Sequence, residues 1–182
     1  MKYFLIEENS KFTQRPHIVN GYTKIDVRNI CPENAYKLPK RELVFIKENP
    51  ETLFTDIISV PFFLVSEKVK KIIQMYDPQI MMKELVLLDK VYGKMGRYYI
   101  PIFEEVDCVG SERLFHLKYS EIKKLVLKRN QIKDKNIFRI AGVEKQCIVG
   151  NLDIVESILR RGCLGIKLTE LKCCVKLEEE SR

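Results

Sequence analysis

The residues best suited to chemistry are three neighbouring carboxylates, Glu104, Glu105 and Asp107. Two carboxylates can act as general acid and general base when their surroundings separate their pKa values. In a strand, however, successive side chains point to opposite faces, so Glu105 and Asp107 would share one face while Glu104 lies on the other. A polar strand edge or turn explains this spacing without catalysis. We therefore predict no catalytic residue, and an enzyme that uses Glu105 or Asp107 is a less favoured alternative.

The cysteines and histidines do not form a metal-binding pattern. The chain has six cysteines but no CxxC pair, and neither His17 nor His116 has a cysteine at a spacing typical of zinc sites. Several cysteines alternate with apolar residues, as small core residues do. We predict free thiols and no metal ligand. The cysteines are Cys31, Cys108, Cys147, Cys163, Cys173 and Cys174.

Motifs that bind cofactors or activate nucleophiles are missing as well. The glycine-bracketed stretch 93–96 lacks the spacing and the hydroxyl residue of a phosphate-binding loop. The chain has no GxSxG turn, no HExxH helix and no zinc-deaminase signature. These patterns predict neither a cofactor nor an enzyme.

Basic residues concentrate in the second half of the chain. The segment 118–139 holds eight lysines and arginines against only Glu121 and Asp134, and the whole chain has a net charge of +7. A basic surface can attract an acidic protein, nucleic acid or an anionic membrane, and it can also serve only to keep a protein solvated. We predict partner-binding residues in this segment. They are Lys123, Lys124, Lys128, Arg129, Lys133 and Lys135.

Two segments have the pattern of a strand, a helix and a second strand. In the first, residues 62–65 form an apolar strand, Ser66 is a candidate N-cap, and an apolar stripe predicts a helix that ends before Asp77-Pro78. The strand that follows, 81–88, pairs with 97–103 in a predicted hairpin, and 104–108 could extend it.

The second such segment lies near the C-terminus. Residues 146–149 form a strand, Gly150-Asn151 a turn, a helical stripe follows, and 166–171 form the last strand. The two units lie about 85 residues apart if one residue is inserted in the second. An internal duplication explains this similarity, and so does chance, because short amphipathic units look alike.

These elements predict an α+β fold with a largely antiparallel sheet and two principal helices. The length favours a single domain, 1–182, in which 2–7 and 43–46 are predicted strands and 9–42 is polar and irregular. The N-terminus lacks a signal-peptide pattern, and no apolar run approaches the roughly 20 residues of a membrane helix. We therefore expect a cytoplasmic protein with no membrane partner. An exposed sheet edge leaves a homodimer open.

The order of several segments resembles a known family. FLVSEKVKKII, GRYYIPIFEEVDC, EIKKLVLKRNQIKDKNIFRIAG and LGIKL follow one another as in a family of bacterial immunity proteins of polymorphic-toxin systems, number eleven in the immunity series and formerly a domain of unknown function. The resemblance covers about 55–172, whereas 1–50 matches poorly. Gly150-Asn151 stands where the family often has a second Ser-Glu helix start. The resemblance implies a cytoplasmic, non-enzymatic protein that binds and neutralises a cognate toxin domain.

Two functions remain open from the sequence. The leading hypothesis is a toxin inhibitor, and the basic character of the chain favours a toxin with an acidic surface. The alternative is a nucleic-acid-binding module that uses the basic 118–139 segment. Nucleic acid is the less favoured partner, because Tyr98-Tyr99 is not accompanied by an RNA-binding motif.

Overall fold

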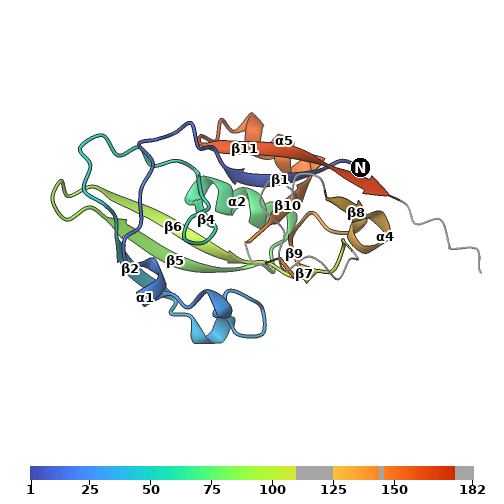
Figure 1. Ribbon diagram of the computed structural model, residues 1–182, viewed down its shortest axis with the longest axis horizontal. Helices are drawn as coiled ribbons and strands as arrows, with labels where there is room; N and C mark the ends of the chain where they lie inside the picture. The colour runs from blue at the N-terminus through green and yellow to red at the C-terminus, as the bar shows by residue number, and fades with distance from the viewer. Residues whose placement is uncertain (110–124, 144–145, 175–182) are drawn as a thin grey trace, which may run out of the picture.

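The chain folds into two β-sheets and two principal helices (Figure 1). The computed structural model describes residues 1–109, 125–143 and 146–174. Within these ranges there are eleven strands and four α-helices, and most strand pairs are antiparallel, so the predicted α+β class is confirmed. The strands are β1 (Tyr3–Glu8), β2 (Arg41–Phe45), β3 (Ile57–Ile58), β4 (Leu64–Ser66), β5 (Met81–Leu88), β6 (Met95–Ile102), β7 (Glu105–Val106), β8 (Val126–Lys128), β9 (Ile137–Ile140), β10 (Ile148–Asn151) and β11 (Ile166–Cys174). The α-helices are α1 (Gly21–Lys24), α2 (Glu67–Tyr76), α4 (Arg129–Ile132) and α5 (Leu152–Arg160), and the 3-10 helices are η1 (Val27–Asn29) and η2 (Ala35–Lys37).

The two principal helices begin at polar caps. The Ser66 hydroxyl accepts a hydrogen bond from the Val69 amide at 3.4 Å, so the predicted cap of α2 is confirmed. At the start of α5 the Asn151 side chain accepts a hydrogen bond from the Ile154 amide at 3.1 Å. Each cap satisfies an amide that has no partner within its helix. Asn151, predicted as a turn residue, is therefore the last residue of β10 and the first contact of α5.

The two sheets share one topology. The five-stranded sheet has the order β2-β5-β6-β4-β3, and the six-stranded sheet has the order β7-β9-β10-β1-β11-β8. In the first, α2 joins β4 to β5, which flank the antiparallel strand β6. In the second, α5 joins β10 to β11, which flank the antiparallel strand β1. The edge strand β2 pairs in parallel with β5, and the edge strand β8 pairs in parallel with β11. Only β7 lacks a counterpart among the described strands.

The central strands are equivalent in detail. Tyr98 of β6 lies opposite the cap residue Ser66, and Tyr3 of β1 lies opposite the cap residue Asn151. Both tyrosines are buried, and each hydroxyl donates to a backbone carbonyl: Tyr98 to Thr55 at 2.6 Å and Tyr3 to Ile132 at 2.5 Å. In Figure 1 the blue strand β1 accordingly lies beside the red strand β11, although they are opposite ends of the chain. These matches support the internal duplication over a chance similarity.

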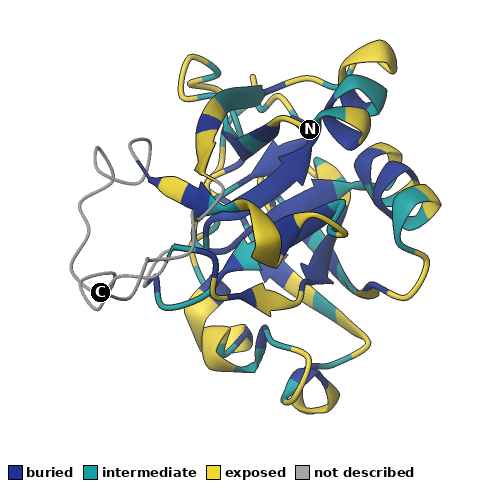
Figure 2. Cartoon of the chain, turned by 90° about the vertical axis from the view of Figure 1, so that its right-hand side faces the viewer, coloured by how far each residue is buried: buried dark blue, intermediate teal, exposed yellow. Residues whose placement is uncertain are grey.

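The sheets share a central core. Buried residues of α2, α5 and both sheets form one apolar cluster, to which Ile73 of α2 and Ile158 of α5 belong. Because strand side chains alternate between faces, Val65 points into this cluster while Leu64 joins a second cluster on the outer face. That outer cluster is covered by residues from the 18–46 stretch, and a third cluster lies on the outer face of the six-stranded sheet. Figure 2 shows the resulting buried interior under exposed loops.

One local prediction was wrong. The hairpin of β5 and β6 is present, but 104–108 does not extend it. Strand β7 instead pairs in parallel with β9 of the six-stranded sheet. Backbone hydrogen bonds from Arg139 to the Glu104 carbonyl (2.9 Å) and from Ala141 to the Val106 carbonyl (3.0 Å) hold it there. The polar connection before β9 contains the short helix α4. Among the described helices, none has the length and apolar character needed to cross a membrane.

Candidate partner-binding surfaces

The three carboxylates do not converge on a common site. Glu105 forms an ion pair with Arg139 at 2.8 Å, and Glu104 forms one with Lys135. Asp107 is exposed just beyond β7. Glu104 and Glu105 thus help to attach β7 to the segment around β9. This arrangement matches the polar strand edge rather than an acid–base pair.

The structure describes four of the six basic residues that we predicted to bind a partner. Lys123 and Lys124 lie outside the described residues. Arg129 and Lys133 are exposed at the two ends of α4, and Lys128 is half-buried at the end of β8. The fourth, Lys135, is occupied by its ion pair with Glu104.

Lysines distant in sequence join Lys128 on one face of the six-stranded sheet. The register places Lys172 opposite Val126 and Cys174 opposite Lys128. Leu127 and Leu171 belong to the third cluster, on the outer face of the six-stranded sheet. Because side chains alternate along a strand, Lys128 and Lys172 point to the opposite face, the side on which α5 packs. Lys2 lies on that side as well, paired with Glu170 at 3.1 Å. We call this group the basic face; it consists of Lys2, Val126, Lys128, Glu170 and Lys172.

A shallow cavity opens on the basic face. Its volume is about 500 Å³. Cys173 is part of the cavity wall. Partial burial raises the pKa of its thiol, and the positive charge of the nearby Arg129 acts to lower that pKa. The cavity is lined by Met1, Lys2, Glu170, Leu171, Lys172 and Cys173.

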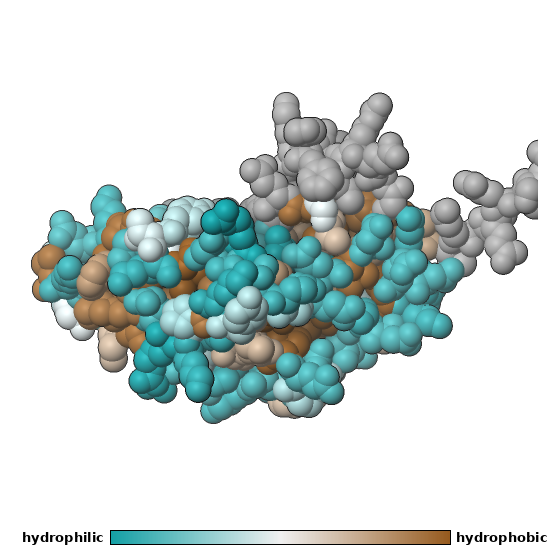
Figure 3. Space-filling view, turned by 90° about the horizontal axis from the view of Figure 1, so that it is seen from below, coloured by the Kyte–Doolittle hydropathy of each residue, from teal (hydrophilic) through white to brown (hydrophobic). Residues whose placement is uncertain are grey.

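The equivalent face of the five-stranded sheet is apolar. Leu43 lies opposite Val86, and Leu88 lies between Phe45 and Met95. Leu43 is 39% exposed and Met95 is 67% exposed, so this face presents apolar surface to water. We call this group the apolar face; it consists of Leu43, Phe45, Val86, Leu88 and Met95. Seen from below, brown side chains also lie between teal ones at the left end and along the middle of the molecule (Figure 3).

Charged side chains border the apolar face. Glu84 forms ion pairs with Arg41 at 2.9 Å and with Arg97 at 3.4 Å. The Lys90 ammonium lies 3.7 Å from the centroid of the Phe45 ring, a cation–π distance. These side chains shield part of the apolar surface from water. They also make the border of the face mostly positive.

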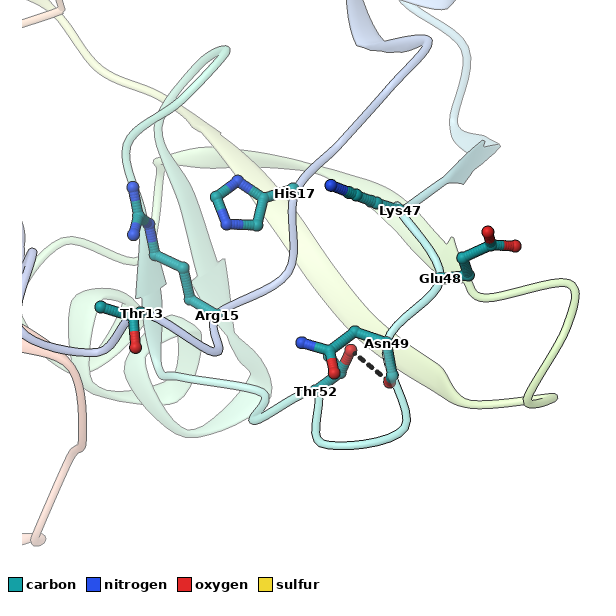
Figure 4. Close-up of a pocket in the computed structure, with 7 residues that line it drawn as sticks. All are labelled: Thr13, Arg15, His17, Lys47, Glu48, Asn49 and Thr52. Carbon is teal, nitrogen blue, oxygen red and sulfur yellow. Dashed lines mark hydrogen bonds between the residues drawn. The ribbon is translucent and has the colours of Figure 1, made fainter.

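A separate polar cavity lies between two segments of the chain (Figure 4). Its volume is about 280 Å³. The first segment contributes Thr13, Arg15 and His17, and the second, which follows β2, contributes the remaining residues. In the close-up, Arg15, His17 and Lys47 lie along one side, while Glu48 points away. The second segment supplies Lys47, Glu48, Asn49 and Thr52.

The comparisons leave the family open. No family model and no curated protein matches the chain. Within 1–109, 125–143 and 146–174, no group of three or more His, Cys, Asp and Glu residues is placed to hold a metal ion. The resemblance to the immunity family therefore stays a prediction. Sequence reasoning missed Lys2 and Lys172 as members of the basic face, because no local pattern shows that β1 and β11 are neighbours.

Proposed function

We propose that this protein is a non-enzymatic immunity protein that binds and neutralises a cognate bacterial toxin domain. The observation that supports this proposal best is the basic face, where Lys2 just before β1, Lys172 of β11 and Lys128 of β8 lie on the same side of three adjacent strands. Strand pairing fixes the backbone positions of these lysines and the face to which they point, so this arrangement of charges exists before a partner arrives. A preformed surface lowers the entropic cost of binding, which an inhibitor requires.

The charge of the face indicates the kind of partner. Arg129 and Lys133 are exposed near Lys128, so the positive surface continues onto α4. Complementary charges accelerate association and exclude partners of like charge. We therefore propose that the toxin presents an acidic surface to this region. An inhibitor that mimicked a nucleic-acid backbone would need the opposite charge.

The first test is recovery of the partner. Tagged protein is purified from native lysate, and bound protein is identified by mass spectrometry while bound nucleic acid is measured by absorbance and nuclease digestion. A stoichiometric toxin domain whose activity the protein abolishes supports the proposal. Nucleic acid that is released by salt, with no protein partner, would favour the alternative function instead.

The second test places the interface. Charge reversal of Lys128, Arg129 and Lys133 to Glu should slow association with the recovered toxin domain and weaken its salt dependence. The matched control reverses three exposed lysines elsewhere, Lys11, Lys40 and Lys71. Equal association rates for the two triple variants would remove Lys128, Arg129 and Lys133 from the interface.

A further inference from the structure

The polar cavity of Figure 4 has the composition of an anion site. Arg15, His17 and Lys47 line one side of it, and the side-chain amide of Asn49 and the hydroxyl of Thr13 belong to the same lining. All of these groups can donate hydrogen bonds, and two of them carry a permanent positive charge. We propose that this cavity binds the phosphate group of a small molecule. The proposal is independent of the partner-binding function, because the cavity shares no residue with the basic face.

The backbone around the cavity is held in place. The Lys47 amide donates to the His17 carbonyl at 2.8 Å, and the Leu53 amide donates to the Gln14 carbonyl at 2.9 Å. These bonds tie the N-terminal segment to the segment after β2. The spacing between the backbones of the two segments is therefore set by the fold.

Two donors are oriented by contacts outside the cavity. Arg15 is mostly buried and is paired with Glu8 at 3.2 Å, and Glu8 in turn accepts the Ser59 amide at 2.9 Å. Asn49 accepts the Glu51 amide through Oδ1 at 2.9 Å, which leaves its NH₂ group for the cavity. An oriented guanidinium is well suited to phosphate, because its planar N–H groups match two oxygens.

The side chains of Lys47 and His17 are not engaged by other described residues. Within the described residues, neither the Lys47 ammonium nor the His17 ring makes a hydrogen bond or an ion pair, and both are exposed. A lysine near other positive groups would ordinarily be compensated by a carboxylate. Here the carboxylates closest in sequence to Lys47 do not pair with it.

The nearby carboxylates are engaged or directed outward. Glu48 points away from the cavity. Glu51 accepts a hydrogen bond from the Gln14 side chain at 2.7 Å, and the buried Asp89 accepts the Asn49 amide at 3.0 Å. Backbone hydrogen bonds hold the pKa of Asp89 below its usual value despite its burial. The cavity therefore presents donors rather than acceptors. Its volume leaves room for a phosphate group and a small attached moiety.

The test is a titration of the full-length protein followed by NMR amide shifts. The probes are inorganic phosphate and adenosine monophosphate, and sodium chloride at equal ionic strength is the reference. We expect shifts confined to 13–17 and 47–52 that saturate with either probe. A smaller Kd for the nucleotide would identify an organic phosphate as the ligand, and equal values would identify free phosphate. Shifts that chloride reproduces, or no saturable shift, would overturn the proposal.

A pair of variants makes the site assignment specific. Lys47→Ala should raise the Kd for phosphate about tenfold, the usual worth of a charged hydrogen bond. The control is Lys40→Ala, which removes an exposed lysine that makes no ion pair with the described residues. Because Lys47 is exposed, its loss should leave the amide spectrum otherwise unchanged. An unchanged Kd in Lys47→Ala would place phosphate elsewhere.

Discussion

The five-stranded and six-stranded sheets have the same strand order, and their corresponding faces differ in chemistry. Next to the helix, both faces keep an ion pair: Arg97 with Glu84 in one sheet and Lys2 with Glu170 in the other. Farther from the helix the strand positions still correspond, but the residue types differ. Phe45 and Val86 occupy the positions that Lys128 and Lys172 occupy in the six-stranded sheet. The ion pair therefore belongs to the shared fold, whereas the outer positions are free to serve different surfaces.

The two sheets also correspond at the cap residue of each principal helix, where a residue from an earlier segment, Asp56 or Asn136, holds the cap. We call these two sets of contacts the junctions. The Ser66 amide donates to the Asp56 carbonyl at 2.9 Å, and the Asn151 amide donates to the Asn136 carbonyl at 2.8 Å. Each junction also reaches the opposite unit: the Leu164 amide donates to the Asp56 carboxylate at 2.6 Å, and Asn136 donates to the Tyr76 carbonyl at 3.1 Å. Asn136 thus holds the C-terminal end of α2, and Asp56 holds the loop that follows α5.

The largest expected effect tests whether the two units fold together. Ile73→Ala in α2 and Ile158→Ala in α5 each remove a fully buried side chain from the shared cluster. Each should lower the free energy of unfolding by about 2–5 kcal/mol. Because the cluster spans both sheets, both variants should keep a single unfolding transition in urea. Met75→Ala, at an exposed position of α2, is the control. Two separate transitions would show that the units are independent.

The next effect distinguishes the junction at Asp56, which holds a carboxylate, from the junction at Asn136, which holds a neutral amide. Asp56→Ala removes a carboxylate that accepts hydrogen bonds from the Ser66 hydroxyl and the Leu164 amide. Hydrogen bonds to a charged group stabilise by about 1.5–3 kcal/mol, and neutral ones by about 1 kcal/mol. We therefore expect Asp56→Ala to destabilise more than Asn136→Ala in urea unfolding. Asp56→Asn should fall between them, and an equal cost for both alanine variants would contradict the distinction.

A smaller, symmetric effect is expected at the central strands. Tyr98→Phe and Tyr3→Phe each remove one hydroxyl that donates to a backbone carbonyl. Each should cost about 1 kcal/mol of unfolding free energy, plus the desolvation of the carbonyl left behind. Because the two tyrosines lie in different sheets, the double variant should show the sum of the single effects. A large difference between the two would mean that the central strands are not equivalent in energy.

The sequence predicted the local elements better than their assembly. Periodicity and capping residues located α2 and the β5–β6 hairpin, because these depend on neighbouring residues. The entry of β1 between β10 and β11 depends on contacts across more than 140 residues, as between Tyr3 and Asn151, and no local pattern contains that information. For the same reason Lys128 was found, but Lys2 and Lys172 were not. The polar cavity was also missed, because Arg15 and Lys47 meet only through tertiary folding.

Exchanging the two surface chemistries should alter the surface and spare the fold. Leu43→Lys with Met95→Lys places two positive charges on the apolar face. Both residues are exposed, so the free energy of unfolding should change by less than about 0.5 kcal/mol per site. Binding of a hydrophobic fluorescent dye should fall, and Lys128→Leu, the opposite exchange, should raise it. If dye binding does not change, the apolar face is not accessible in solution.

The smallest effect concerns two cysteines of the six-stranded sheet region. Cys108 is buried, and its burial raises the pKa of the thiol to about 12, whereas Cys174 is exposed at the end of β11. Only the thiolate reacts with iodoacetamide, so at pH 8 the folded protein should be labelled at Cys174 well before Cys108. The unfolded thiol ionises near pH 8.5, whereas the folded thiol stays protonated far above that pH. Cys108 therefore contributes less stability as the pH rises above about 8.5, and Cys108→Ala should flatten that decline. Labelling of Cys108 as fast as Cys174 in the folded protein would show that the core around Cys108 opens readily.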